Sequence, residues 1–128
     1  MAKVTGIGGV FFKTRDPKAL AAWYREHLGL ELEDWGGAVL KWPTDPRPDG
    51  GLTVWHVAAK DSEWFPGPLM VNYRVDDLDG LLEQLRAAGV EVVGGPEEEF
   101  NGRFAWVLDP EGRKVELWEP SAAPDQTR

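Results

Sequence analysis

Cysteine is absent from this chain of 128 residues. Its absence excludes disulfide bridges, thiol nucleophiles and metal centres built on thiolates. Basic residues are also scarce, since 14 lysines and arginines stand against 22 acidic residues and leave a net charge of −8. Such a chain lacks the cationic face that phosphate groups require, so we expect no nucleic acid partner and no anionic membrane partner.

Long apolar runs are missing as well. No stretch of about 18 apolar residues is present to cross a bilayer. The segment Met1–Gly6 has no apolar run of the kind that forms a secretory signal, so we expect a cytoplasmic protein. The apolar fraction is nevertheless 42%, with seven tryptophans and five phenylalanines, which is enough for the core of one domain.

A first structural unit is predicted over residues 1–58. A β-branched and aromatic strand at Ile7–Thr14 leads to Asp16 and Pro17, a helix N-cap followed by the residue favoured at the first helical position. The predicted helix ends before Gly29, which suits a left-handed C-cap. The strands expected to follow are Leu30–Leu32, Ala38–Trp42 and Leu52–Val57, with a polar turn at 43–51.

The same order of elements recurs over residues 69–119. A strand at Leu69–Val75 precedes a helix that Asp77 caps and Gly89 closes. A short strand at Val90–Val93 comes next. The unit ends in a hairpin whose strands are Arg103–Leu108 and Arg113–Trp118, around the turn Asp109–Gly112. Two βαβββ modules in tandem are therefore predicted, which gives an α+β fold.

The two modules are joined by a linker at residues 59–68. It carries Trp64 and Phe65, and exposed aromatic side chains in a linker are unfavourable. We therefore expect the linker to pack on the body of the protein or on a partner chain. The polar tail at 120–128 is expected to be mobile.

Strand alternation assigns side chains to two faces of the predicted sheet. The face toward the helices should hold Val10, Phe12, Val71, Tyr73, Val75, Val115 and Leu117. The opposite face should hold Gly9, Phe11, Lys13, Trp55, Met70, Asn72, Arg74, Lys114, Glu116 and Trp118, with Arg103 one strand away. Aromatic surface combined with a few fixed polar groups is typical of a small-molecule pocket.

Glu116 is the polar residue of most interest, because it is a carboxylate in mid-strand between Val115 and Leu117. A structural interpretation pairs it with Arg74 or Arg103 as a buried ion pair. Ordinary core packing is the corresponding interpretation for Phe11 and Trp118.

The two-fold βαβββ arrangement, the Asp16-Pro17 helix start, the turn Asp109–Gly112 (DPEG) and the closing segment Val115–Pro120 (VELWEP) resemble the vicinal oxygen chelate superfamily. That superfamily includes glyoxalase I, extradiol dioxygenases, and fosfomycin- and bleomycin-resistance proteins. The resemblance covers about residues 4–119. It implies curled mixed sheets around a cleft, commonly completed by a second chain, so a homodimer is expected.

In metal-using members of the superfamily the ligands come from the first and last strands of each unit. The resemblance places these positions at Gly9, Trp55, Met70 and Glu116, of which only Glu116 can bind a hard or borderline divalent cation. We therefore expect no metal site and no cofactor. A shift of one residue in the register would instead turn His56 inward beside Glu116, and the two together would then be metal-ligand candidates.

Two functions compete on this basis. The first is metal-independent binding of a small, preferably aromatic molecule, as in the bleomycin-resistance branch, with the binding residues Phe11, Trp55, Met70, Asn72, Arg74, Arg103 and Trp118. The second is a lyase, isomerase or dioxygenase in which Glu116 is a general base or metal ligand, with an arginine stabilising the anion formed. A subunit or regulatory domain is a third possibility. The net charge favours a cationic or neutral ligand.

Overall fold

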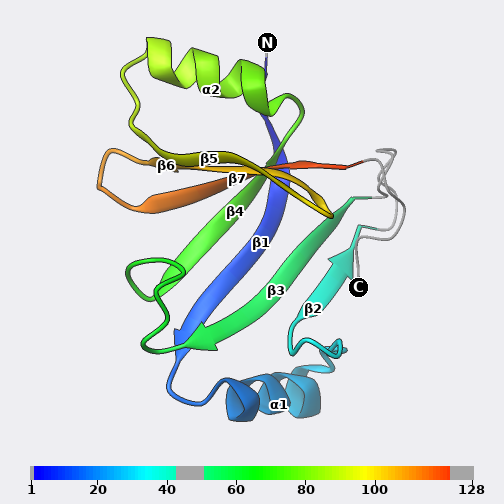
Figure 1. Ribbon diagram of the computed structural model, residues 1–128. Helices are drawn as coiled ribbons and strands as arrows, with labels where there is room; N and C mark the ends of the chain where they lie inside the picture. The colour runs from blue at the N-terminus through cyan, green and yellow to red at the C-terminus, as the bar shows by residue number, and fades with distance from the viewer. Residues whose placement is uncertain (1, 43–50, 122–128) are drawn as a thin grey trace.

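The computed structural model describes residues 2–42 and 51–121, so nearly all of the predicted polar turn at 43–51 and most of the predicted mobile tail at 120–128 lie outside the described residues. Over these ranges the chain forms a single curled sheet with a helix against each half (Figure 1). The elements are β1 (Val4–Thr14), α1 (Pro17–Leu28), β2 (Ala38–Lys41), β3 (Leu52–Ala59), β4 (Leu69–Val75), α2 (Leu78–Ala87), β5 (Val92–Glu99), β6 (Gly102–Leu108) and β7 (Lys114–Pro120).

The strands are ordered β2-β3-β1-β4-β7-β6-β5 across the sheet. The pairs β1–β3 and β4–β7 are parallel, and the other neighbouring strands are antiparallel. The antiparallel pair β1–β4 stands at the centre, where it joins the half that carries α1 to the half that carries α2 (Figure 1). The predicted α+β class and mixed sheet are thus confirmed.

The first unit contains one strand fewer than predicted. Leu30–Leu32 has an apolar alternation typical of a strand, but it is not one. Leu30 N–H donates to the carbonyl of Tyr24 at the end of α1, and Glu33 N–H donates to the carbonyl of Gly37 across a tight turn. The leucines themselves pack under α1. The second unit has the predicted order of elements, although β5 begins at Val92 rather than Val90 and continues to Glu99.

Both helix starts agree with the predicted caps. The carboxylate of Asp16 accepts a hydrogen bond from Ala19 N–H, and that of Asp77 accepts one from Gly80 N–H, each at 3.1 Å. Gly29 adopts a left-handed φ of 71° and ends α1. In addition, Glu119 accepts a hydrogen bond from Leu78 N–H at 2.7 Å, which ties the start of α2 to β7.

Each helix covers an apolar cluster on the outer side of the sheet. Under α2, Leu78, Leu81 and Leu82 pack on residues of β4, β6 and β7. Full burial of each of these leucines contributes about 1.5–3 kcal/mol. Under α1, Ala21 packs against a cluster that includes Trp55. In the described part of the chain neither helix combines the length and apolar character needed to cross a membrane.

Trp55 lies on the side of the sheet opposite to the predicted one. Its ring packs on α1, with its centroid 4.9 Å from that of Tyr24, so the prediction that it faces the cleft is wrong. The reason is the parallel register of β1 and β3, which pairs Val10 with Trp55 and Phe11 with His56. Neighbours across a ladder share a face, so Trp55 follows Val10 toward the helix and His56 follows Phe11 toward the cleft.

The linker packs on the body of the protein. Phe65 is only 1% exposed and belongs to a third cluster, with Phe11 and Met70. The ring of Trp64 lies 4.5 Å from that of Phe11, measured between centroids. Segment 60–68 therefore crosses from β3 to β4 as an aromatic strap on the cleft side of the sheet.

Candidate functional site

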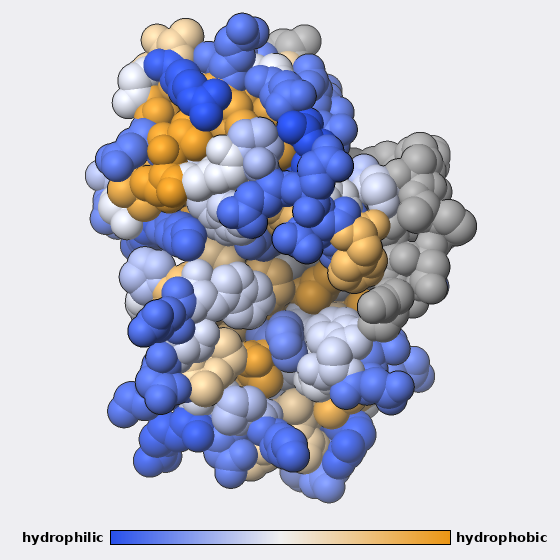
Figure 2. Space-filling view, in the orientation of Figure 1, coloured by the Kyte–Doolittle hydropathy of each residue, from blue (hydrophilic) through white to orange (hydrophobic). Residues whose placement is uncertain are grey.

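A cleft of about 510 Å³ opens on the face of the sheet opposite to the helices. The space-filling view shows the molecule hollowed across its middle, between the half carrying α2 and the half carrying α1 (Figure 2). Residues from both halves, from the strap and from the β5–β6 hairpin contribute to it. The lining residues are Gly8, Phe11, Trp35, Val54, His56, Trp64, Asn72, Glu97, Glu99, Phe100, Asn101, Phe104, Trp106, Glu116 and Trp118.

Glu116 is a cleft residue whose carboxylate is held on both sides. The side chain is 5% exposed. Asn72 Nδ2 donates to Oε1 at 2.7 Å, and Trp106 Nε1 donates to Oε2 at 2.8 Å. Strand register explains both bonds, because β4 places Asn72 directly beside Glu116 and β6 places Trp106 on its other side. The sheet therefore fixes the orientation of the carboxylate.

Burial raises the pKa of Glu116 above its ordinary value, because the charged form loses hydration. The hydrogen bonds from Asn72 and Trp106 and the positive charge of Lys114 act in the opposite direction and favour the carboxylate. Lys114 itself donates to the carbonyl of Trp64 at 3.4 Å. In the described ranges, the side chains that donate hydrogen bonds to Glu116 are those of Asn72 and Trp106, and both are neutral.

The predicted ion pair between Glu116 and an arginine is not formed by Arg103. That guanidinium points to α2, where it makes two bonds of 3.0 Å with the carboxylate of Asp79, and it also pairs with Glu98 at 3.3 Å. The prediction that Arg103 joins the cleft is wrong, since it alternates with the cleft residue Phe104 along β6. Arg74 shares the face of β4 that carries Asn72, but it is buried beside Trp118, with Cζ 5.3 Å from the ring centroid of that residue.

Aromatic rings form opposite walls of the cleft. Phe11 and Trp64 pack together on one wall. Phe104 and Trp118 stack on the other with their planes 3° apart and centroids 5.8 Å apart. Trp118 Nε1 donates to the carbonyl of Asn101 at 2.9 Å, which holds that ring in place. These walls offer flat apolar surfaces on both sides of a buried carboxylate.

His56 lines the cleft, as the alternative register placed it. Its ring packs edge-on against Trp35 at 5.0 Å between centroids, and its Nδ1 lies next to Gly37. Burial lowers the pKa of His56, so the imidazole is neutral near pH 7. The predicted ligand position at Gly9 is also displaced, because β1 is irregular between Ile7 and Gly9 and it is Gly8 that lines the cleft.

The predicted site residues are thus divided by the structure. Phe11, Asn72, Glu116 and Trp118 line the cleft. Met70 is buried in the cluster of Phe11 and Phe65, behind the wall. Arg74 is buried beside Trp118 and does not line the cleft, and Trp55 and Arg103 face the helices.

Sequence reasoning missed other lining residues, notably Trp106 and four residues around the β5–β6 turn, Glu97, Glu99, Phe100 and Asn101. The position of Trp106 could have been predicted from the sequence, because a hairpin centred on the turn Asp109–Gly112 places Trp106 opposite Glu116. The hairpin residues carry no such signal, since their place over the cleft depends on how the sheet curls.

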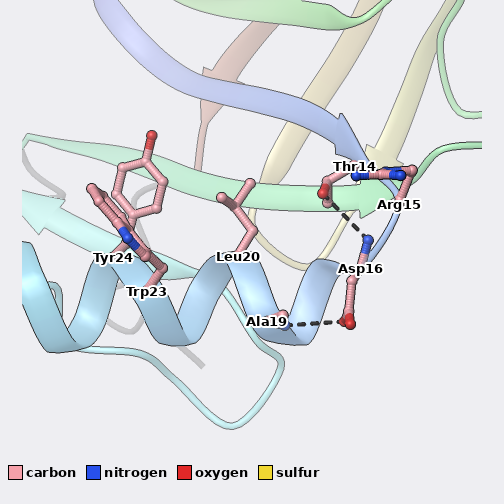
Figure 3. A pocket seen from close by; sticks show the side chains of 7 residues that line it. All are labelled: Thr14, Arg15, Asp16, Ala19, Leu20, Trp23 and Tyr24. Carbon is pink, nitrogen blue, oxygen red and sulfur yellow. Dashed lines mark hydrogen bonds between the residues drawn. The ribbon is translucent and has the colours of Figure 1, made fainter.

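A second hollow, of about 540 Å³, lies outside this cleft at the start of α1 (Figure 3). Trp23 and Tyr24 line one end of it, and Thr14 and Asp16 line the other. The close view shows that its polar groups serve the helix cap: Asp16 N–H donates to Thr14 Oγ1, and Ala19 N–H donates to Asp16 Oδ1 (Figure 3). This hollow lacks a buried charged group, so the cleft at Glu116 is the better candidate.

The sequence profile of the glyoxalase-like domain matches residues 9–118, nearly the whole chain. The chain belongs to the glyoxalase-like family. The resemblance to the vicinal oxygen chelate superfamily, predicted from the two-fold arrangement of modules, is thereby confirmed.

Solved structures share the fold of this glyoxalase-like chain. Methylmalonyl-CoA epimerase from Mycobacterium tuberculosis is 24% identical, with 92% of this chain and 89% of that chain covered and a TM-score of 0.61. A variant of the Streptomyces coelicolor epimerase in complex with 2-nitronate-propionyl-CoA is 21% identical, with coverages of 93% and 99% and a TM-score of 0.69. A structure described as NAD-dependent benzaldehyde dehydrogenase from Legionella pneumophila is 14% identical, with coverages of 88% and 98% and a TM-score of 0.60.

One curated relative is an uncharacterized protein of Mycolicibacterium smegmatis. It is 26% identical over 72 residues, which are 56% of this chain and 62% of the relative. The chain therefore matches less than two thirds of that relative's length.

The donor set of this glyoxalase-like cleft does not fit a catalytic divalent metal. Over residues 2–42 and 51–121 no cluster of three or more His, Asp or Glu side chains is placed to hold a metal ion. A catalytic site of this kind normally has about three protein ligands. His56 and Glu116 both line the cleft, but two side chains fall short of that number. The absence of a metal nevertheless stays a prediction.

Proposed function

We propose that this glyoxalase-like protein binds a small molecule with a flat apolar part in its cleft, and that Glu116 anchors the polar end of that molecule. The carboxylate of Glu116, buried yet held by two neutral donors between aromatic walls, carries the proposal. The volume of about 510 Å³ lies within the usual range of small-molecule sites. The expected homodimer and cytoplasmic location accompany this proposal as predictions.

The alternative function is enzymatic, and the raised pKa of Glu116 favours it, since a general base works best with a pKa nearer neutrality. An isomerase would also need a group that stabilises the anion formed on proton removal. Arg74 and Arg103 were predicted in that role, but neither lines the cleft. Binding is therefore the function that the geometry supports better. Loss of turnover of a dicarbonyl, catechol or epoxide in Glu116→Gln would favour the enzyme.

The epimerase structures with acyl-CoA ligands suggest a CoA thioester as a further candidate ligand. Such a ligand carries several phosphate charges, which proteins usually meet with lysine, arginine or a helix N-terminus. The described lining residues include no lysine or arginine, and three of them, Glu97, Glu99 and Glu116, are acidic. The cleft is therefore better matched to a ligand without phosphate.

The Trp64→Ala variant tests the binding proposal. Trp64 is 36% exposed, so its removal should cost little stability while removing one face of the cleft. With naphthylmethanol, a neutral flat probe, we expect the dissociation constant to rise about tenfold, since loss of one stacking face costs about 1–3 kcal/mol. Isothermal titration calorimetry measures the change.

The matched control is Trp23→Ala, which removes another exposed tryptophan, on α1 and outside the cleft. It should leave probe affinity unchanged. Equal losses in both variants, or no binding of the probe to the wild type, would contradict the proposed function.

A further inference from the structure

We infer that the cleft selects an organic cation, so that its ligand carries an amine, ammonium or amidinium group on a flat apolar body. This inference rests on the proposed binding function and adds the charge of the ligand to it. Three features of the described lining carry it: the sign of its charged groups, the state of Glu116 and the faces of the aromatic walls.

The charged groups of the lining are of one sign. Glu97, Glu99 and Glu116 are its carboxylates, and among the lining residues in the described ranges there is no lysine or arginine. His56 adds no positive charge near pH 7, because its burial disfavours the imidazolium form. The two glutamates of the β5–β6 hairpin are exposed, so they act mainly by drawing cations to the entrance.

Glu116 keeps capacity for a further partner. An ionised carboxylate has about four acceptor sites, and Asn72 and Trp106 use one on each oxygen. Loss of hydration makes the charge unfavourable in this place. A ligand cation at Glu116 would restore the lost interaction, and it would do so where Coulomb attraction is less screened than in water. A neutral ligand of the same shape gains no Coulomb attraction to Glu116.

The walls of the cleft suit a cation as well as a flat ring. Ring faces attract cations, most strongly in tryptophan. The molecule already shows this preference near the cleft. Lys114 Nζ lies 5.6 Å from the ring centroid of Trp106, and Arg74 Cζ lies 5.3 Å from that of Trp118.

These two cations do not cancel the charge of the cleft. Arg74 lies beside Trp118 on the neighbouring strand β4, where it is 2% exposed, and it is not among the lining residues. Lys114 does favour the ionised form of Glu116, yet its ammonium group also donates to the carbonyl of Trp64. Lys13 is a third cation nearby, over the ring of Phe65 in the strap, but the charged residues that line the cleft itself are the three carboxylates.

Three probes of nearly equal shape test the inference: naphthylmethylamine, which is a cation near neutral pH, naphthylmethanol, which is neutral, and naphthoate, which is an anion. We expect the wild type to bind the amine at least about tenfold more tightly than the alcohol, with naphthoate weakest. Isothermal titration calorimetry near neutral pH and at low salt measures all three.

The Glu116→Gln variant should bring the amine and the alcohol to similar affinities, because the amide keeps an acceptor oxygen but carries no charge. The fold should tolerate it, since rotation of the Asn72 amide lets its Oδ1 accept from the new Gln while Trp106 still donates. A second variant, Glu97→Gln with Glu99→Gln, should weaken the preference partly. Glu111→Gln, at an exposed residue of the β6–β7 turn, is the matched control and should change nothing.

The outcomes separate the two proposals. Equal binding of all three probes, or preference for naphthoate, overturns the charge inference and leaves the binding function standing. A preference for the amine that survives in Glu116→Gln overturns the assignment to Glu116. No binding of any probe overturns both proposals.

Discussion

Replacement of Asn72 with aspartate is expected to destabilise the protein by at least about 3 kcal/mol at about pH 8 and far less at about pH 5. The substitution keeps the size of the side chain but exchanges a donor for a second carboxylate. Because Asn72 Nδ2 is 2.7 Å from Glu116 Oε1, the two carboxylates would lie within hydrogen-bond distance, and both are buried.

The direction of the pH effect follows from linkage. Two adjacent buried carboxylates raise the pKa of one of them in the folded state above its value in the unfolded chain. The loss of stability is then complete at pH values above the raised pKa of the folded state. It disappears as the pH falls toward the pKa of the unfolded chain, because the two carboxylates come to share a proton. Stability of Asn72→Asp should therefore increase on acidification, relative to the wild type at each pH.

Urea unfolding at the two pH values measures the effect. Asn101→Asp is the matched control, since it makes the same exchange at the rim of the cleft, where the Asn101 side chain makes no hydrogen bond to residues 2–42 or 51–121. The control should cost less than about 1 kcal/mol at either pH. If Asn72→Asp were as stable as its control at about pH 8, the buried contact between Asn72 and Glu116 would be contradicted.

Gly102→Ala is expected to cost at least about 3 kcal/mol. Gly102 begins β6 with a φ of 137°, where L side chains are strained. A Cβ there would also collide with the carbonyl oxygen of Glu119 and approach Trp118 Nε1 to 2.7 Å. The collision cannot be relieved easily, since β7 is held against β6 by the pairing of Gly102 with Pro120.

Gly112→Ala separates the collision from the backbone strain. Gly112 has a φ of 82° in the β6–β7 turn, and a Cβ there would meet no atom within 4 Å. Its replacement should cost about 1 kcal/mol from the positive φ alone. Thermal and urea unfolding of both variants give the difference. Equal costs would show that β7 moves away freely, contrary to the packing described.

Local chemistry was sufficient to predict the helices. The caps at Asp16, Asp77 and Gly29 act within a few residues of chain, so their sequence signals survive folding. The repeat of the modules was predictable for a similar reason, since the order strand, helix, hairpin follows from local signals that recur along the sequence. The DPEG turn also fixed which strands pair in the closing hairpin.

Contacts between distant strands account for the errors. Alternation states that Trp55 and His56 face opposite ways, but only the register of β3 against β1 decides which of them faces the cleft. For Leu30–Leu32, alternation is present and a partner strand is not. Phe104 pairs with Trp118 and shares its cleft face, so Arg103, which alternates with Phe104 along β6, faces the helices.

The central pairing of β1 with β4 has a mechanical consequence for the cleft. Backbone partners run from Val4 and Val75 at one end to Phe12 and Leu69 at the other, so a ladder of hydrogen bonds joins the two halves through the middle of the sheet. The two halves therefore cannot separate without breaking that ladder. Core strands of this kind have the highest free energies of local opening. Any displacement that accompanies ligand entry should then be small and lie at the periphery, in the strap with Trp64 and in the tip of the β5–β6 hairpin. The entry rate should respond to changes in those segments and be insensitive to changes at the central ladder.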